Sequence, residues 1–200
     1  MPPSPPSRRI TTVLTLVAAS LLLLLGIATA LAAFSGGFAP AASRIPVLHP
    51  GQTFHAGGMD ITVRDARLID GLRTSGAFPD DGERLLIVRL DVTNVDHEPR
   101  ATVLSTSLEN VRVQGLSEHP TASRADDGTV APRLQPHVPA PILLTWTVPA
   151  DRFDGGQPIV LELQNETVQT STFAGGRYWQ PLGVGATVPL TLVDAGRGDR

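Results

Sequence analysis

The chain of 200 residues contains no cysteine and no lysine, and only 4% of its residues are aromatic. The missing cysteine excludes disulfide bonds, cysteine-ligated zinc, thiol nucleophiles and the attachment of a bacterial lipid anchor. A net charge of −3 and a hydrophobic content of 42% exclude both a nucleic-acid binder with a basic surface and an extended disordered chain. All sixteen basic residues are arginine. We interpret this as the codon bias of a GC-rich bacterial genome, the alternative being selection for bidentate contacts to carboxylates or phosphates.

A run of 25 uncharged residues extends from Ile10 to Phe34. As a helix it would be about 37 Å long, which is enough to cross a bilayer core of about 30 Å with some tilt. Arg8 and Arg9 precede the run, and the next basic residue after it is Arg44. Because basic residues favour the cytoplasmic side, residues 1–9 are predicted to form a cytoplasmic tail and the chain beyond Phe34 to lie outside the membrane.

The length of this run favours an uncleaved signal-anchor over a signal peptide, whose apolar core has about 7–15 residues. Cleavage with secretion is the alternative, because Ala28-Thr29-Ala30 and Ala30-Leu31-Ala32 match the small-x-small pattern of signal peptidase sites. Residues 35–50 are rich in Gly, Ala, Ser and Pro and are predicted to be a flexible linker. The expected location is therefore the cell membrane, crossed once, with the C-terminal domain outside the cytoplasm.

From Gly51 onward apolar side chains recur at every second position, a period that predicts β-strands with one buried face. The strongest patterns cover residues 59–63, 86–92, 142–148, 159–163 and 188–192. Weaker candidates cover residues 52–55, 102–104, 108–113 and 167–173. Eight or nine short strands at this spacing predict an all-β sandwich over 51–194, followed by a tail of residues 195–200.

Glycine and proline refine the strand arrangement. Gly57-Gly58 is predicted to close a tight hairpin between two short strands. Pro189 cannot donate a ladder hydrogen bond, so the last strand is expected at a sheet edge. The strand that contains Trp146 has no proline after its first residues, so we expect it in a central position with Trp146 in the core.

The stretch Leu85–Asn94 reads LLIVRLDVTN and is followed by a polar turn. It resembles the strand ending in V-T-N of a bacterial family of secreted or anchored immunoglobulin-like sandwich domains, related to the mycobacterial immunoprotective extracellular antigens. The opening Gly51–Val63 and the strand end Trp146–Asp151 also fit this family, whereas Gln135–Pro139 stands where the family often has a proline-glycine turn. The resemblance covers about residues 51–165. It implies an immunoglobulin-like antiparallel β-sandwich outside the cytoplasm and supplies no catalytic residues.

Five histidines are possible metal ligands, but they lack the short spacing typical of metal sites: His49, His55, His97, His119 and His137. His55 and Met59 are the weak candidates for a copper or zinc site, because imidazole and thioether ligands suit copper. The acidic clusters Asp80-Asp81-Glu83 and Asp126-Asp127 lack the alternating spacing of a calcium loop and are interpreted as solvated turn residues. We expect no bound cofactor.

Catalytic motifs were not found in the sequence. Serine, histidine and aspartate are present, but no Gly-x-Ser-x-Gly nucleophile elbow occurs, and a Ser-x-x-Lys motif requires the missing lysine. The chain is therefore expected not to be an enzyme. An envelope hydrolase without a recognisable motif is the alternative.

The segment Gly175–Pro181 reads GGRYWQP and is predicted to be a loop. Tyr178 is the only tyrosine of the chain, and it lies between Arg177 and Trp179. Aromatic residues with arginine are typical of interface hot spots, so these three residues are candidate partner contacts. The alternative interpretation is a loop that caps the open end of the sandwich.

Together these patterns predict a non-catalytic interaction or accessory module of the bacterial cell envelope. Its expected partners are the lipid bilayer, through residues 10–34, and another envelope or membrane protein, with no nucleic acid among them. A copper- or zinc-binding envelope protein is the first alternative function, and the hydrolase is the second.

Overall fold

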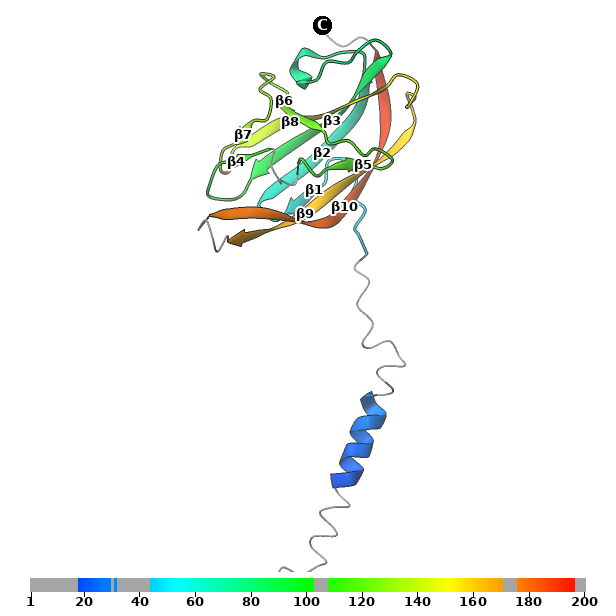
Figure 1. Cartoon of the computed structure of the whole chain (residues 1–200), viewed down its shortest axis with the longest axis vertical. Helices are drawn as coiled ribbons and strands as arrows, with labels where there is room; N and C mark the ends of the chain where they lie inside the picture. Colours follow the sequence, from blue (N-terminus) through cyan, green and yellow to red (C-terminus); the bar gives the residue numbers. More distant parts are fainter. Residues whose placement is uncertain (1–17, 30, 32–43, 103–107, 171–175, 197–200) are drawn as a thin grey trace, which may run out of the picture. The chain divides into compact units, whose positions relative to one another are not determined.

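The computed structural model describes residues 18–29, 31, 44–102, 108–170 and 176–196 (Figure 1). The chain divides into two compact units, Met1–Arg44 and Ile45–Arg200, each of which is described by itself.

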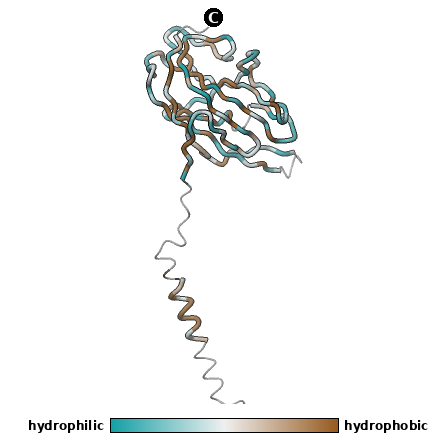
Figure 2. Tube along the Cα trace, turned by 180° about the vertical axis from the view of Figure 1, so that it is seen from behind, coloured by the Kyte–Doolittle hydropathy of each residue, from teal (hydrophilic) through white to brown (hydrophobic). Residues whose placement is uncertain are grey.

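In the first unit, residues 18–29 form a helix that is mostly hydrophobic (Figure 2). The hydroxyl of Thr29 donates a hydrogen bond to the carbonyl oxygen of Leu25 at 2.7 Å. Apart from these residues and residue 31, the predicted span 10–34 lies outside the described part of the chain. The helices among the described residues include none with the length and apolar character needed to cross a membrane.

The second unit is built from β-strands and one short 3-10 helix in its described part. The elements are β1 (Thr53–Ala56), β2 (Met59–Ile69), η1 (Arg73–Ser75), β3 (Glu83–Asn94), β4 (Arg100–Ala101), β5 (Arg112–Val113), β6 (Thr121–Arg124), β7 (Arg133–Leu134), β8 (Pro139–Pro149), β9 (Pro158–Thr170) and β10 (Arg177–Gly196). The five strongly predicted runs lie inside β2, β3, β8, β9 and β10, so the all-β prediction is confirmed.

Eight strands form one curled sheet in the order β5-β9-β10-β2-β3-β8-β6, with β1 paired to β2, and β4 and β7 form a separate ribbon (Figure 1). Most pairs are antiparallel, as predicted, but β10 runs parallel to β2. The reason is the length of β10, whose first part pairs with β9 and whose last residues, from Leu192, pair with β2. One layer of the sandwich contains β5, β9 and the first part of β10, and the other contains β1, β2, β3, β8 and β6. The end of β10 belongs to this second layer, so one strand takes part in both.

The core lies between these layers. Alternate side chains of β2, β3 and β8 face those of β9 and β10, and the largest buried one is Trp146. Its indole nitrogen donates to the carbonyl oxygen of Glu118 at 3.1 Å. Because β8 lies between β3 and β6, the predictions of a central strand and a core Trp146 are confirmed.

The prediction that Pro189 places the last strand at an edge is wrong. β10 lies between β9 and β2 in the sheet. Pro189 is tolerated because it precedes Leu192, where pairing with β2 begins. Thr187, two residues before Pro189, instead accepts from the amide of Leu48 and donates to the carbonyl oxygen of Pro46, residues of the predicted linker that pair with the sheet.

The predicted hairpin at Gly57-Gly58 is confirmed. Ala56 and Met59 are register partners in the β1–β2 pair, which leaves the two glycines as the loop. The turn of this hairpin packs against residues of the candidate site described below.

Candidate functional site

Asn94 joins two loops at one end of the sandwich. It is the last residue of β3 and is fully buried. Its side-chain amide donates to the carbonyl oxygens of Glu98 at 2.8 Å and Leu134 at 3.2 Å, and its side-chain oxygen accepts from the amide of Asp96 at 3.0 Å. The backbone oxygen of Asn94 accepts from the amide of His137 at 2.7 Å. One buried side chain with its backbone thus fixes the loop after β3 against the turn before β8.

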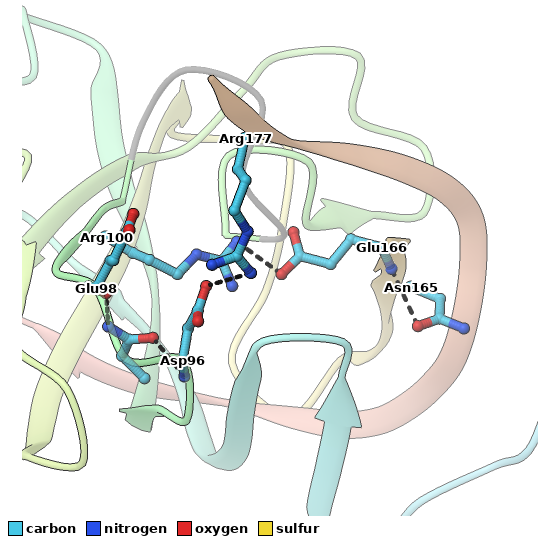
Figure 3. A network of polar contacts seen from close by, with 7 residues as sticks. Asp96, Glu98, Arg100, Asn165, Glu166 and Arg177 are labelled. Atoms are coloured by element: carbon cyan, nitrogen blue, oxygen red, sulfur yellow. Dashed lines mark hydrogen bonds and ion pairs between the residues drawn. The ribbon is translucent and has the colours of Figure 1, made fainter. Parts of the chain in front are cut away.

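The same end of the sandwich contains a buried ion pair. Arg100 begins β4, and its Nη2 donates to Oε1 of Glu166 in β9 at 2.8 Å (Figure 3). The two side chains are only 4% and 1% exposed. The Arg100 guanidinium also lies 4.0 Å from the ring centroid of Trp179 in β10, a cation–π contact that strengthens where water is excluded. Arg100 therefore connects β4 with the two paired strands β9 and β10.

The β1–β2 turn packs closely against this cluster. A Cβ atom on Gly57 would lie 2.5 Å from the backbone oxygen of Glu166, and one on Gly58 would lie 2.5 Å from Nη1 of Arg100 and 2.6 Å from the ring of Trp179. Gly57 also has a φ of +58°, where glycine carries no steric cost. Only glycine at both positions lets the turn support the ion pair.

The C-terminal end of β9 and the N-terminal end of β10 pair with each other and form an arm, defined here as residues 165–170 of β9 and 177–182 of β10. In Figure 1 the arm lies toward the side of the domain where β4 and β7 are found. The register shifts twice on β10, between Pro181 and Gly183 and between Val184 and Ala186. Extra residues of this kind bend a strand and redirect its side chains, and here the bends bring the arm to Arg100.

The structure places Arg177, Tyr178 and Trp179 in a strand, so the predicted loop at this segment is corrected. Arg177 pairs with Asp96 at 3.3 Å (Figure 3), and Trp179 stacks on Arg100. Tyr178 lies between them and points to the other face, because neighbouring strand residues alternate. It is 51% exposed. The three candidates therefore divide into two anchors and one exposed aromatic ring. Glycine and proline in the segment concealed its pairing with β9.

His55 and Met59 are not brought together. In the β1–β2 pair, His55 is opposite Asp60 and Met59 is opposite Ala56. Directly opposed residues share a face, so Met59 is buried with Ala56 whereas His55 is exposed and its Nδ1 lies 2.6 Å from Oδ1 of Asp60. In the residues that the structure describes, no group of three or more His, Asp or Glu side chains is arranged to hold a metal ion.

Two histidines that appeared isolated in the sequence do meet. The ring centroids of His97 and His137 are 6.1 Å apart, with the ring planes at 65°. Both residues are exposed and lie on the two loops that Asn94 connects. Forty positions separate them along the chain, and the spacing of the two residues contains no signal of the contact.

The acidic clusters make local contacts. Arg124 donates to both carboxylate oxygens of Asp126, at 2.9 and 2.5 Å, and this hydrogen-bonded guanidinium lowers the pKa of Asp126. Asp127 accepts from the amide of Thr129, which lowers the pKa of Asp127. Glu83 accepts from the amide of Asp80. These carboxylates take part in turn hydrogen bonds, as the turn interpretation requires.

A surface hollow of about 320 Å³ lies between the loop before β6 and the end of β8. It is lined by Gly115, Leu116, Ser117, Glu118, Thr147, Val148, Pro149 and Arg152. The lining contains a serine and a glutamate but no histidine, so it does not form the serine–histidine pair that a hydrolase of that type needs.

No family model matches the chain, and no curated protein matches it. Among solved structures, the chain is similar to an uncharacterised β-sandwich protein from Clostridium difficile 630, with 13% identity and a TM-score of 0.45 over 72% of this chain and 99% of that one. It is also similar to a "putative lipoprotein" from Bacillus subtilis subsp. subtilis strain 168, with 12% identity and a TM-score of 0.35 over 66% of this chain and 38% of that one.

Proposed function

We propose that this chain is a membrane-anchored, non-catalytic interaction module of the bacterial cell envelope. In this proposal residues 10–34 anchor the chain with residues 1–9 in the cytoplasm. The sandwich outside is immunoglobulin-like and related to the mycobacterial immunoprotective extracellular antigens, and it binds another envelope protein. The arm is the binding surface.

The observation that supports a binding role is the exposure of apolar side chains on a strand that is firmly anchored. Tyr178 and Leu182 are 51% and 62% exposed, while Arg177 and Trp179 beside them are held by Asp96 and Arg100. A rigid aromatic ring loses little conformational entropy on binding, which is why tyrosine is frequent in interface hot spots. Because Asp96 and Arg100 already order this strand, it loses less conformational entropy when a partner binds.

Strand addition along the arm is a less suitable binding mode than side-chain contact. The first part of β10 carries Pro181 and two register shifts. Proline and bulges are the devices by which open edges avoid pairing with other strands. We therefore assign recognition to the exposed side chains of the arm.

Site-specific photo-crosslinking in the native membrane tests the arm as a docking surface. A photoreactive phenylalanine derivative at position 178 or 182 is expected to trap one protein partner. The matched control is position 193, because Val193 is 53% exposed on the same strand but beyond the arm. Equal trapping from position 193, or none from 178 and 182 at native expression, would refute the arm as the binding surface.

The anchor has its own test. Washing membranes with alkaline carbonate should leave the full chain in the membrane fraction, because a spanning helix resists extraction and a peripheral domain does not. Protein sequencing of the mature N-terminus then separates the two export routes. A mature chain that begins directly after Ala30 or directly after Ala32 would show cleavage and overturn the signal-anchor.

A further inference from the structure

The contact between His97 and His137 places two potential metal ligands side by side. Metal–nitrogen bonds are about 2.0–2.1 Å long, so two imidazoles that share one ion have ring centroids roughly 5–6 Å apart. The observed separation of 6.1 Å lies just above that range. Both side chains are exposed, so small rotations of the rings suffice to close the remaining distance.

We propose that His97 and His137 form a binding site for one divalent transition-metal ion of the class that imidazole prefers, namely Cu²⁺, Ni²⁺ or Zn²⁺. The two histidines supply two ligands, and water supplies the others. The site is independent of the arm as a docking surface, and neither His55 nor Met59 contributes to it.

The backbone holds the two rings in place before an ion arrives. Asn94 bonds to the amide of Asp96, next to His97, and to the carbonyl of Glu98, on its other side. The same residue accepts from the amide of His137 itself at 2.7 Å. Two ligands on separate loops normally lose entropy when an ion brings them together, and the hydrogen bonds of this buried residue reduce that loss.

The backbone of His137 gives a second, independent indication. Its φ is +60°, a left-handed conformation that is uncommon for residues with a Cβ atom. Glycine would occupy this position without strain. The imidazole of this residue contacts that of His97, and backbone strain of this kind is concentrated at ligand-binding sites.

The remaining histidines provide matched controls. The His55 ring lies 2.6 Å from a carboxylate of Asp60, so it is an exposed imidazole beside an acid but without a second ring. His119 lies within 3.0 Å of Arg112 Nη2 and of the Glu109 carbonyl. Neither side chain lies in a histidine pair.

Isothermal titration of Cu²⁺, Ni²⁺ and Zn²⁺ into the full chain in a nonionic detergent tests the site. We expect one ion per chain, and more than about a 10-fold loss of affinity in either H97N or H137N, since loss of a ligand costs at least as much as loss of a residue behind it. The H55N and H119N variants should bind as the natural chain does. Unchanged affinity in H97N and H137N, a loss in only one of them, or an equal loss in H55N would overturn the proposal.

A measurement on the natural chain keeps the proposal testable if a variant fails to fold. Substoichiometric Cu²⁺ broadens the NMR signals of protons close to the ion. The imidazole signals of His97 and His137 should broaden together and before those of the other three histidines. Broadening that begins at another histidine, or at only one of this pair, would exclude a shared site.

Discussion

Replacing Glu166 by glutamine tests the ion pair that anchors the arm. The carboxylate is 1% exposed and faces a guanidinium that is 4% exposed, so the variant leaves the charge of Arg100 buried without its counter-ion. Breaking a buried pair from one side costs about 3–5 kcal/mol. Nε and Nη1 of Arg100 have no hydrogen-bond partner among the described residues, so the rest of this guanidinium offers no existing bond that would compensate. We expect a loss within that range.

Urea unfolding of the full chain in detergent measures this loss. Tryptophan fluorescence follows the unfolding. Trp146 and Trp179 are the only tryptophans, both lie in the second unit, and Trp179 contacts the ion pair. With a urea m-value of about 2 kcal/mol per molar, a loss of 3–5 kcal/mol lowers the unfolding midpoint by about 1.5–2.5 M.

The matched control is D126N, which removes an exposed pair with Arg124 and should lower the midpoint far less, because water screens exposed ion pairs. The double variant R100M/E166L replaces both charges by apolar side chains, and it should recover most of the lost stability because no buried charge remains. A midpoint for E166Q no lower than that of D126N would refute the assignment of the pair as the anchor of the arm.

Three further predictions concern the same end of the domain and its far strand. Gly57→Ala should destabilise the domain more than Gly51→Ala, since both have positive φ but only Gly57 has a backbone oxygen 2.5 Å from the added Cβ; equal unfolding midpoints would contradict this. Trp179→Ala should raise amide hydrogen exchange in residues 177–182 and leave β3 unchanged, whereas unaltered exchange in the arm would show that the ring is not an anchor. The Arg84 guanidinium, hydrogen-bonded to Asp194, lowers the pKa of that carboxyl, so its stabilisation is complete above about pH 3.9 and is lost as the pH falls through the lower folded-state pKa. Acid titration of stability should therefore show a smaller loss for D194N than for the natural chain, and identical profiles would exclude this contribution.

The long strands could be predicted because each contains its own evidence. Residues 86–92 and 142–148 have an apolar side chain at every second position, because one face of β3 and β8 packs in the main core. The short strands β4, β6 and β7 lie outside the predicted runs. β6 contains only Ala122 as an apolar residue, and its strand conformation depends on its bonds to β8 rather than on a local pattern.

Proline and glycine led to two wrong expectations for the same strand. Pro189 suggested an edge, and the Gly- and Pro-rich segment 175–181 suggested a loop, yet both belong to β10 apart from the first two residues of that segment. The rules for these residues describe single positions in a ladder. A strand of 20 residues satisfies them locally, by changing partner after Pro189 and by shifting register after Pro181.

The contacts in the candidate sites could not be predicted from the alternation of apolar and polar residues, because they depend on the register between strands. Thr93 is opposite Pro139 in the β3–β8 pair, and this register places Asn94 beside the turn that carries His137. A slip of one residue would turn every apolar side chain to the wrong face and is excluded by the pattern. A slip of two residues would keep every side chain on its face and still move His137 by about 7 Å along β3. Asn94 removes that ambiguity, because two of its hydrogen bonds, to the carbonyl oxygen of Leu134 and from the amide of His137, reach the turn before β8 and depend on the register. The residue that selects the register is thus the one that brings His97 and His137 together, so their pairing is a property of the three-dimensional fold.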